Sequence, residues 1–245
     1  MFQGPNDMAA QVRIIVISFH DSGRIQLNIA GPAWPKNILE LISIALEPFS
    51  SDLFPTGDAA IAFFLVILAW LLSELIGGQL VPTMRRGGAK VERRNVGSNL
   101  MLLLAITACL SLTYVFARLE VAMLPAWVFY VGLALMIAGI ALRQWAVAVL
   151  GRYFSVVIGV QDGQRVVDAG PYRFVRHPSY TGFLLILVGI GLAAQSWGAA
   201  LLIFVTFGLI LGHRIVAEER VLVSELGEEY VDYMGTTKRL IPFLI

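Results

Sequence analysis

Four long stretches of the chain contain no Asp, Glu, Lys or Arg, and they limit the folds that it can adopt. They are Ala59–Ser73, Asn95–Ala117, Val121–Leu142 and His177–Gly212. A helix needs roughly 20 mostly apolar residues to cross the hydrocarbon core of a membrane. Only 14% of the residues are charged, whereas soluble domains carry about 25%. The chain is therefore expected to be an all-α integral membrane protein.

The last stretch has 36 residues, which is too long for one membrane span and slightly short for two. Ala194–Gly198 interrupts it near its middle. We interpret it as two helices in a tight hairpin, which gives five transmembrane helices if the first tolerates Glu74. Ionisable groups inside membranes are costly and often functional. The sequence names no partner for Glu74, and Arg143 lies close enough to the membrane edge to reach the interface.

The basic residues indicate the orientation of these helices. The loop Met84–Asn95 holds five of them, and such loops face the cytosol. Five spans then place the N-terminus outside, and they place 143–176 and the tail after Gly212 in the cytosol. A bacterial inner membrane or its equivalent is the expected location. The net charge of +1 implies no bulk attraction to nucleic acid, and membrane lipids are the expected surroundings.

Residues 1–56 differ from the rest and are interpreted as an extracytosolic extension of the transmembrane domain, which is residues 57–245. Val12–Phe19 and Arg24–Ile29 alternate partly between apolar and polar residues, which predicts a small β-hairpin. Pro35–Phe49 has an apolar face typical of an amphipathic helix at the membrane surface.

Two polar segments, 150–178 and the tail after Gly212, are expected on the cytosolic side, where the hairpin brings them together. Arg176 and His177 precede Pro178, which suits the first turn of a helix. A helix N-terminus with two basic neighbours suits a carboxylate or another anion. Alternatively, Arg176 only anchors a transmembrane helix at the membrane interface, as basic residues commonly do.

Glu218 and Glu219 lie about two turns beyond Gly212 and point roughly 100° apart on a helix. One can face Arg176 while the other faces water. A carboxylate there suits an ammonium group or ribose hydroxyls, although the pair taken alone favours an ordinary solvated helix end. Arg239 is a candidate anion clamp or a surface charge.

Several familiar sites are missing from the sequence. No strand–Gly-x-Gly-x-x-Gly–helix unit and no P-loop is present, which argues against nucleotide folds of those types. The chain has one cysteine, Cys109, and no His/Cys cluster, so no metal site is expected.

The C-terminal half resembles a known family. The pattern is Gly170-x-Tyr172-x-x-x-Arg176-His177-Pro178-x-Tyr180, an apolar hairpin, Glu218-Glu219-x-x-Leu222, Gly227-x-x-Tyr230-x-x-Tyr233 and Arg239-x-x-Pro242. It is similar to the isoprenylcysteine carboxyl methyltransferases over roughly residues 145–245. Phospholipid N-methyltransferases, small-thiol methyltransferases and the C-terminal part of sterol reductases share much of it.

The resemblance implies an S-adenosylmethionine site built from the cytosolic segments, the hairpin and a C-terminal helix. Carried over by motif, the cofactor would contact Val166, Val167, Gly170, Tyr172, His177, Pro178, Tyr180, and Glu218 or Glu219. Arg176 and Arg239 would be the catalytic residues on the carboxylate side, and Tyr230 and Tyr233 would bind substrate.

The activity that the resemblance implies is methyl transfer to the C-terminal carboxylate of isoprenylated cysteine or to a similar lipid-tailed or small-molecule acceptor that enters from the membrane. A phospholipid N-methyltransferase or a small-thiol S-methyltransferase is an alternative. An NADPH-dependent sterol-type reductase is disfavoured, because such reductases have more upstream spans than this chain can hold. A non-enzymatic scaffold leaves the ordered motif unexplained.

Overall fold

The computed structural model describes residues 14–19, 25–30, 54–80, 96–155 and 163–240, in two units, Met1–Ala62 and Phe63–Ile245. In the first unit, β1 (Ile14–Phe19) pairs antiparallel with β2 (Ile25–Ala30). Both strands overlap the stretches for which the sequence predicts a β-hairpin. Because of these two strands, the described part of the chain is mostly helical rather than all-α. The predicted helix Pro35–Phe49 and the basic loop 84–95 lie outside the described residues.

The helices follow the charge-free stretches of the sequence. They are α2 (Gly57–Ser73) with its π-helical continuation η3 (Glu74–Leu80), α4 (Val96–Arg118), α5 (Val128–Leu150), α6 (Pro178–Ala193), α7 (Trp197–Leu226) and α8 (Glu228–Thr236). Short 3-10 turns occupy η4 (Gly151–Tyr153) and η5 (Gly170–Arg173). Within the described ranges, 58–77, 128–153 and 197–226 are long and apolar enough to cross a membrane. Two shorter apolar helices, Leu103–Arg118 and Pro178–Ala193, accompany them.

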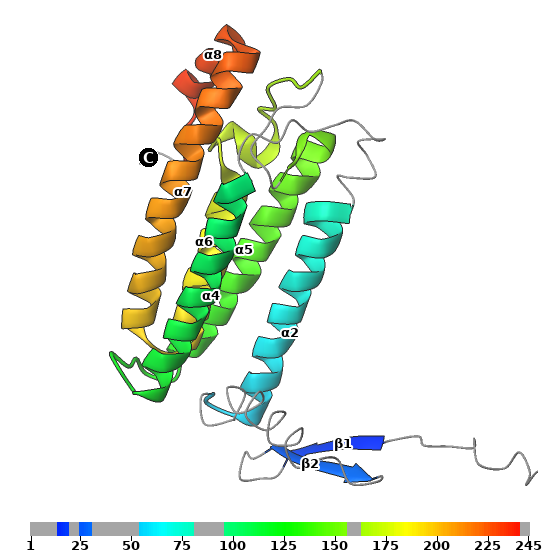
Figure 1. Cartoon of the computed structure of the whole chain (residues 1–245), viewed down its shortest axis with the longest axis vertical. Coiled ribbons are helices and arrows are strands. Elements are labelled where there is room, and N and C mark those ends of the chain that lie inside the picture. Colours follow the sequence, from blue (N-terminus) through cyan, green and yellow to red (C-terminus); the bar gives the residue numbers. More distant parts are fainter. Residues whose placement is uncertain (1–13, 20–24, 31–53, 81–95, 156–162, 241–245) are drawn as a thin grey trace, which may run out of the picture. The chain divides into compact units, whose positions relative to one another are not determined.

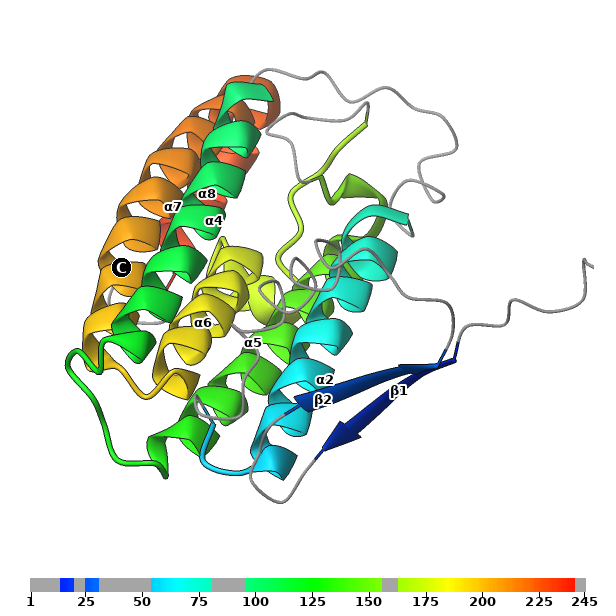
Figure 2. The same cartoon turned by 60° about the horizontal axis from the view of Figure 1, so that its bottom comes forward.

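In the second unit, α5 packs along α6, α7 packs against α6, and α4 packs on α7 (Figures 1 and 2). Glycines allow α5 and α6 to approach closely: a Cβ on Gly182 would lie 2.6 Å from the carbonyl oxygen of Gly139. The apolar core between the helices includes Trp70, Cys109, Met136, Phe183, Ile186, Ile190, Ile203, Phe207 and Leu211.

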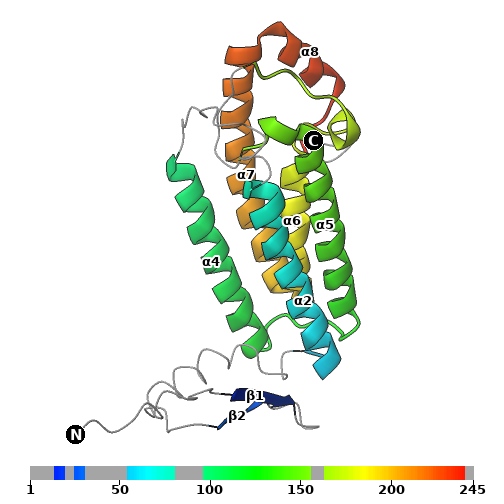
Figure 3. The same cartoon turned by 90° about the vertical axis from the view of Figure 1, so that its right-hand side faces the viewer.

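Only three residues, 194–196, connect α6 to α7. Gln195 takes a positive φ of 54° in this turn. The Ser196 hydroxyl accepts a hydrogen bond from the backbone N–H of Ala199 at 3.2 Å and so caps α7. Because α7 turns back beside α6, its far end and α8 lie at the same end of the unit as the segment before α6 (Figure 3).

Candidate active site

The segment that follows α8 is bound to the residues that precede α6. Val175 forms a parallel bridge with Lys238. The backbone N–H of Arg176 donates to the carbonyl of Lys238 at 2.7 Å, and that of His177 donates to the carbonyl of Arg239 at 3.0 Å. The two polar segments that the sequence places on one side of the membrane are therefore joined by backbone hydrogen bonds.

A buried carboxylate reinforces this junction. Glu219, whose side chain is 5% exposed, accepts hydrogen bonds from Arg176 Nε at 2.9 Å and from Arg239 Nε at 3.0 Å. The guanidinium of Arg176 also donates to the carbonyls of Met234 and Thr237. These ion pairs tie α7, the start of α6 and the tail together, and we call Glu219, Arg176 and Arg239 the tail clamp.

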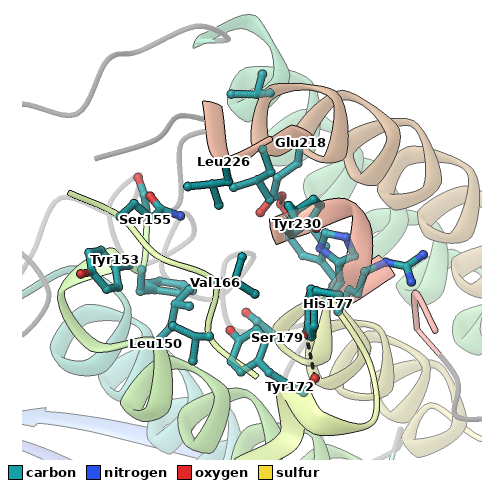
Figure 4. Close-up of a pocket in the computed structure, with 18 of the residues that line it drawn as sticks. Leu150, Tyr153, Ser155, Val166, Tyr172, His177, Ser179, Glu218, Leu226 and Tyr230 are labelled. Carbon is teal, nitrogen blue, oxygen red and sulfur yellow. Dashed lines mark hydrogen bonds between the residues drawn. The ribbon is translucent and has the colours of Figure 1, made fainter. Parts of the chain in front are cut away.

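A cavity of about 130 Å³ lies beside the tail clamp, with walls from α5 to α8 and from the segment 164–167. In Figure 4, Glu218 and Tyr230 lie on one side of it and Leu150 and Tyr153 on the other, with Val166 between them. Nine of the residues predicted for the site line this cavity: Val166, Val167, Tyr172, Arg176, His177, Tyr180, Glu218, Tyr230 and Tyr233.

The other four predicted residues are not among the described residues that line the cavity. Gly170, with a φ of 58°, begins η5 and packs so closely that a Cβ would lie 2.9 Å from the Val149 side chain. Pro178 is the first residue of α6. Glu219 and Arg239 belong to the tail clamp. Each of the four is close in the sequence to a lining residue or is hydrogen-bonded to one, without lining the cavity itself.

The two adjacent glutamates face different surroundings, as their spacing on a helix predicts. Glu219 faces Arg176, whereas Glu218 lines the cavity and accepts a hydrogen bond from the Tyr180 hydroxyl at 2.7 Å. The Tyr180 ring stacks on His177, with the ring centroids 5.6 Å apart and the planes 14° from parallel. Glu218, Tyr180 and His177 thus form one ordered polar wall.

The tyrosines contributed by η5 and α8 are neutral at physiological pH. Burial raises the pKa of Tyr172 and of Tyr230, and the nearby Glu218 charge raises both further. Burial also raises the pKa of Tyr233 to about 12. The hydroxyl of Tyr233 donates to the carbonyl of Tyr172 at 2.7 Å. These hydroxyls can donate hydrogen bonds at neutral pH but do not supply a base.

Two buried arginines that line the cavity are missing from the site predicted from the sequence. Arg214 is 4% exposed, and its guanidinium lies 5.8 Å from the centroid of the Tyr180 ring. It precedes Glu218 by four residues, so helical spacing would have placed both on one face. Arg143 is 8% exposed and binds Glu74, which corrects the interpretation that its guanidinium reaches the interface.

Most of the residues that form the cavity lie in a part of the chain that is similar in sequence to a known protein family. Residues 132–224 match the isoprenylcysteine carboxyl methyltransferase (ICMT) family. Protein-S-isoprenylcysteine O-methyltransferase B of Arabidopsis thaliana is 32% identical over 120 residues, which cover 48% of this chain and 61% of that protein. A probable protein-S-isoprenylcysteine O-methyltransferase of Oryza sativa subsp. japonica is 36% identical over 124 residues, 48% of this chain and 63% of that protein. The matches therefore span about three fifths of the length of these relatives.

The fold has a counterpart among solved structures. The eukaryotic intramembrane Ras methyltransferase ICMT superposes with a TM-score of 0.57 at 19% sequence identity, over 83% of this chain and 70% of that one. The arrangement of apolar helices is therefore that of an integral membrane protein of this fold. The resemblance inferred from the order of the motifs is confirmed: residues 132–224 carry the sequence pattern of the isoprenylcysteine carboxyl methyltransferase family.

Proposed function

We propose that the protein is a membrane methyltransferase that uses S-adenosylmethionine to methylate the C-terminal carboxylate of isoprenylated cysteine or of a similar lipid-tailed acceptor. The observation that carries this proposal is the cavity at the end of the apolar helices, lined mostly by residues of the family-matched region. Relatives with the same region are named as protein-S-isoprenylcysteine O-methyltransferases.

The chemistry of the cavity wall fits the methyl donor. Glu218 offers a carboxylate to the ammonium group or the ribose hydroxyls of the donor. Val166, Val167 and Leu222 offer apolar surface to its adenine. The donor, when bound, supplies a methyl group that its sulfonium already activates. The protein then has to bind the donor, orient the acceptor and exclude water.

A carboxylate acceptor needs no general base, because it is already ionised at pH 7. This agrees with a cavity whose tyrosines on η5 and α8 stay protonated. Arg176 lines the cavity, but its guanidinium is held by Glu219 and by backbone carbonyls. We assign the acceptor carboxylate to Arg214, which is buried in the cavity wall, in place of the Arg176 and Arg239 expected from the motif.

The membrane arrangement is part of the proposal. Five spans would place the N-terminus outside, and the C-terminus and the cavity in the cytosol, of a bacterial inner membrane or its equivalent. The basic loop 84–95 and the apolar stretches of the sequence support this arrangement. The lipid tail of the acceptor would enter from the bilayer between helices, and the donor would enter from the cytosol.

Titration calorimetry of the purified protein with S-adenosylhomocysteine and with NADPH tests the proposed class. We expect S-adenosylhomocysteine to bind, and binding of NADPH alone would refute the proposal. Labelled-methyl transfer is then measured with farnesylcysteine analogues, small thiols and phosphatidylethanolamine. Transfer to a thiol or to the amine lipid alone would reject the carboxylate acceptor.

Arg214→Gln tests the assignment of the acceptor site. It should raise the KM for the carboxylate acceptor by at least about tenfold, because a charge-assisted hydrogen bond is lost. Affinity for S-adenosylhomocysteine should change little. The matched control is Arg220→Gln, which removes an exposed arginine from the same helix. An unchanged KM in Arg214→Gln would return the assignment to Arg176.

A further inference from the structure

An ion pair joins the first membrane helix to the cavity. Arg143 of α5 donates from Nη2 to Oε2 of Glu74 at 2.7 Å and from Nε to Oε1. The two side chains are 9% and 22% exposed. Gln144 Nε2 donates to Ser73 Oγ at 3.1 Å, which adds a second polar contact between the same segments. Glu74 lies outside residues 132–224, so the family match does not cover this pair.

The remaining nitrogen of the guanidinium holds the start of α6. Arg143 Nη1 donates to Ser179 Oγ at 2.7 Å and to the Ser179 carbonyl at 3.2 Å. The guanidinium carbon also lies 5.3 Å from the centroid of the Phe183 ring. Ser179 stands between His177 and Tyr180, which form the polar wall of the cavity. Arg143 therefore fixes the helical turn that presents this wall.

Arg143 itself lines the cavity, so its charge acts on whatever binds there. Interactions between charges are much stronger in a protein interior than in water. A sulfonium donor is a cation, and an arginine without a counter-charge in the wall would repel it. Glu74 supplies that counter-charge through two hydrogen bonds.

We propose that Glu74 and Arg143 are a positioning pair for the methyl donor. Arg143 orients the first turn of α6, and Glu74 cancels the positive charge of Arg143 so that the cavity accepts a sulfonium. This inference rests on the proposed function, because it takes the methyl donor as the occupant of the cavity.

The test compares two ligands that differ in charge at one atom. S-adenosylmethionine has a sulfonium, whereas S-adenosylhomocysteine has a neutral thioether. Calorimetric dissociation constants are measured for both with wild type, Glu74→Gln, Arg143→Gln and the double variant. A merely structural defect weakens both ligands alike, whereas a lost counter-charge changes the ratio of the two constants.

Glu74→Gln keeps the size of the side chain and leaves Arg143 without its counter-charge. It should weaken S-adenosylmethionine on the order of tenfold more than S-adenosylhomocysteine, as expected for one uncompensated charge at an effective dielectric constant of about 20. Arg143→Gln leaves Glu74 as an uncompensated anion and should shift the ratio in the opposite direction. The double variant should return the ratio close to that of wild type.

Glu120→Gln is the matched control, because Glu120 is exposed in the loop between α4 and α5, at the other end of α5. Its ratio should equal that of wild type. An unchanged ratio in Glu74→Gln would overturn the inference while leaving the proposed function standing. If Glu74→Gln does not fold, Arg143→Gln decides alone, and an unchanged ratio there has the same meaning. Failure of wild type to bind either ligand would refute the proposed function and this inference together.

Discussion

Replacing the two adjacent glutamates one at a time should separate the stability of the tail clamp from ligand binding. Glu219→Gln keeps the shape of the side chain but removes the negative charge that faces Arg176. The side chains of this pair are 5% and 8% exposed. Removing one partner of a buried ion pair costs about 3–5 kcal/mol. Arg176 keeps its bonds to two backbone carbonyls, so we expect about 3 kcal/mol, at the lower limit.

The exposed partner in the tail clamp should matter much less. The Arg239 side chain is 43% exposed, and solvent-exposed ion pairs contribute less than about 1 kcal/mol. For a chain of this size, 1 kcal/mol corresponds to about 2–4 °C in melting temperature. We therefore expect Glu219→Gln to melt about 6–12 °C below wild type, and Arg239→Gln to melt less than about 4 °C below it.

Thermal unfolding in detergent, followed by near-ultraviolet circular dichroism as a measure of tertiary packing, and calorimetry with S-adenosylhomocysteine give the two readouts. Glu218→Gln is the matched variant, because Glu218 faces the cavity and accepts a hydrogen bond from the Tyr180 hydroxyl instead of joining the tail clamp. It should melt within about 2 °C of wild type, since such an exchange perturbs about one hydrogen bond, and should bind the ligand on the order of tenfold more weakly. Equal melting shifts in Glu218→Gln and Glu219→Gln would refute the separation of roles.

Three further predictions concern packing, pH and orientation. Gly182→Ala should destabilise the protein by about 1–3 kcal/mol in the same melting assay, because its Cβ would meet the backbone of α5 at 2.6 Å. Gly208→Ala, where nothing lies within 4 Å of the added Cβ, should not, and equal effects would contradict the packing argument. The raised pKa of Tyr233 means that folding favours its neutral form, so wild type should lose stability as the pH rises from 10 to about 12. Tyr233→Phe should lose less over that window, and identical pH profiles would contradict a role for this hydroxyl. A protease site inserted within residues 84–95 should resist protease added to spheroplasts until they are lysed, and cleavage before lysis would reverse the proposed orientation.

The sequence could predict the parts of the site that depend on local periodicity. The charge-free stretches indicated roughly where the helices lie, although α5 (Val128–Leu150) is displaced from the stretch Val121–Leu142, and Pro178 marked the first residue of α6. The spacing of Glu218 and Glu219 predicted that the two would face different surroundings, as they do. These features depend only on helix geometry and on residue type, both of which a sequence displays directly.

The parts that could not be predicted depend on contacts between distant residues. Glu74 and Arg143 are 69 residues apart, and no local pattern links them. Arg176 and Arg239 stood in the expected motif, yet both are bound to Glu219, because the direction of a side chain follows from packing and not from spacing. The motif therefore indicated which residues come together, but not which of them line the cavity and which pair with Glu219.

The pairing between the tail and the start of α6 has a consequence for how the protein assembles. Helices in a bilayer satisfy their own backbone hydrogen bonds, so each can insert before it meets its neighbours. The cavity wall instead depends on bonds such as that from Arg176 to the carbonyl of Thr237, across 61 residues. A chain inserted in the membrane without that closure would retain its helical signal while lacking a binding site. Helix content is thus a poor measure of active protein for this molecule, and ligand affinity is the appropriate one.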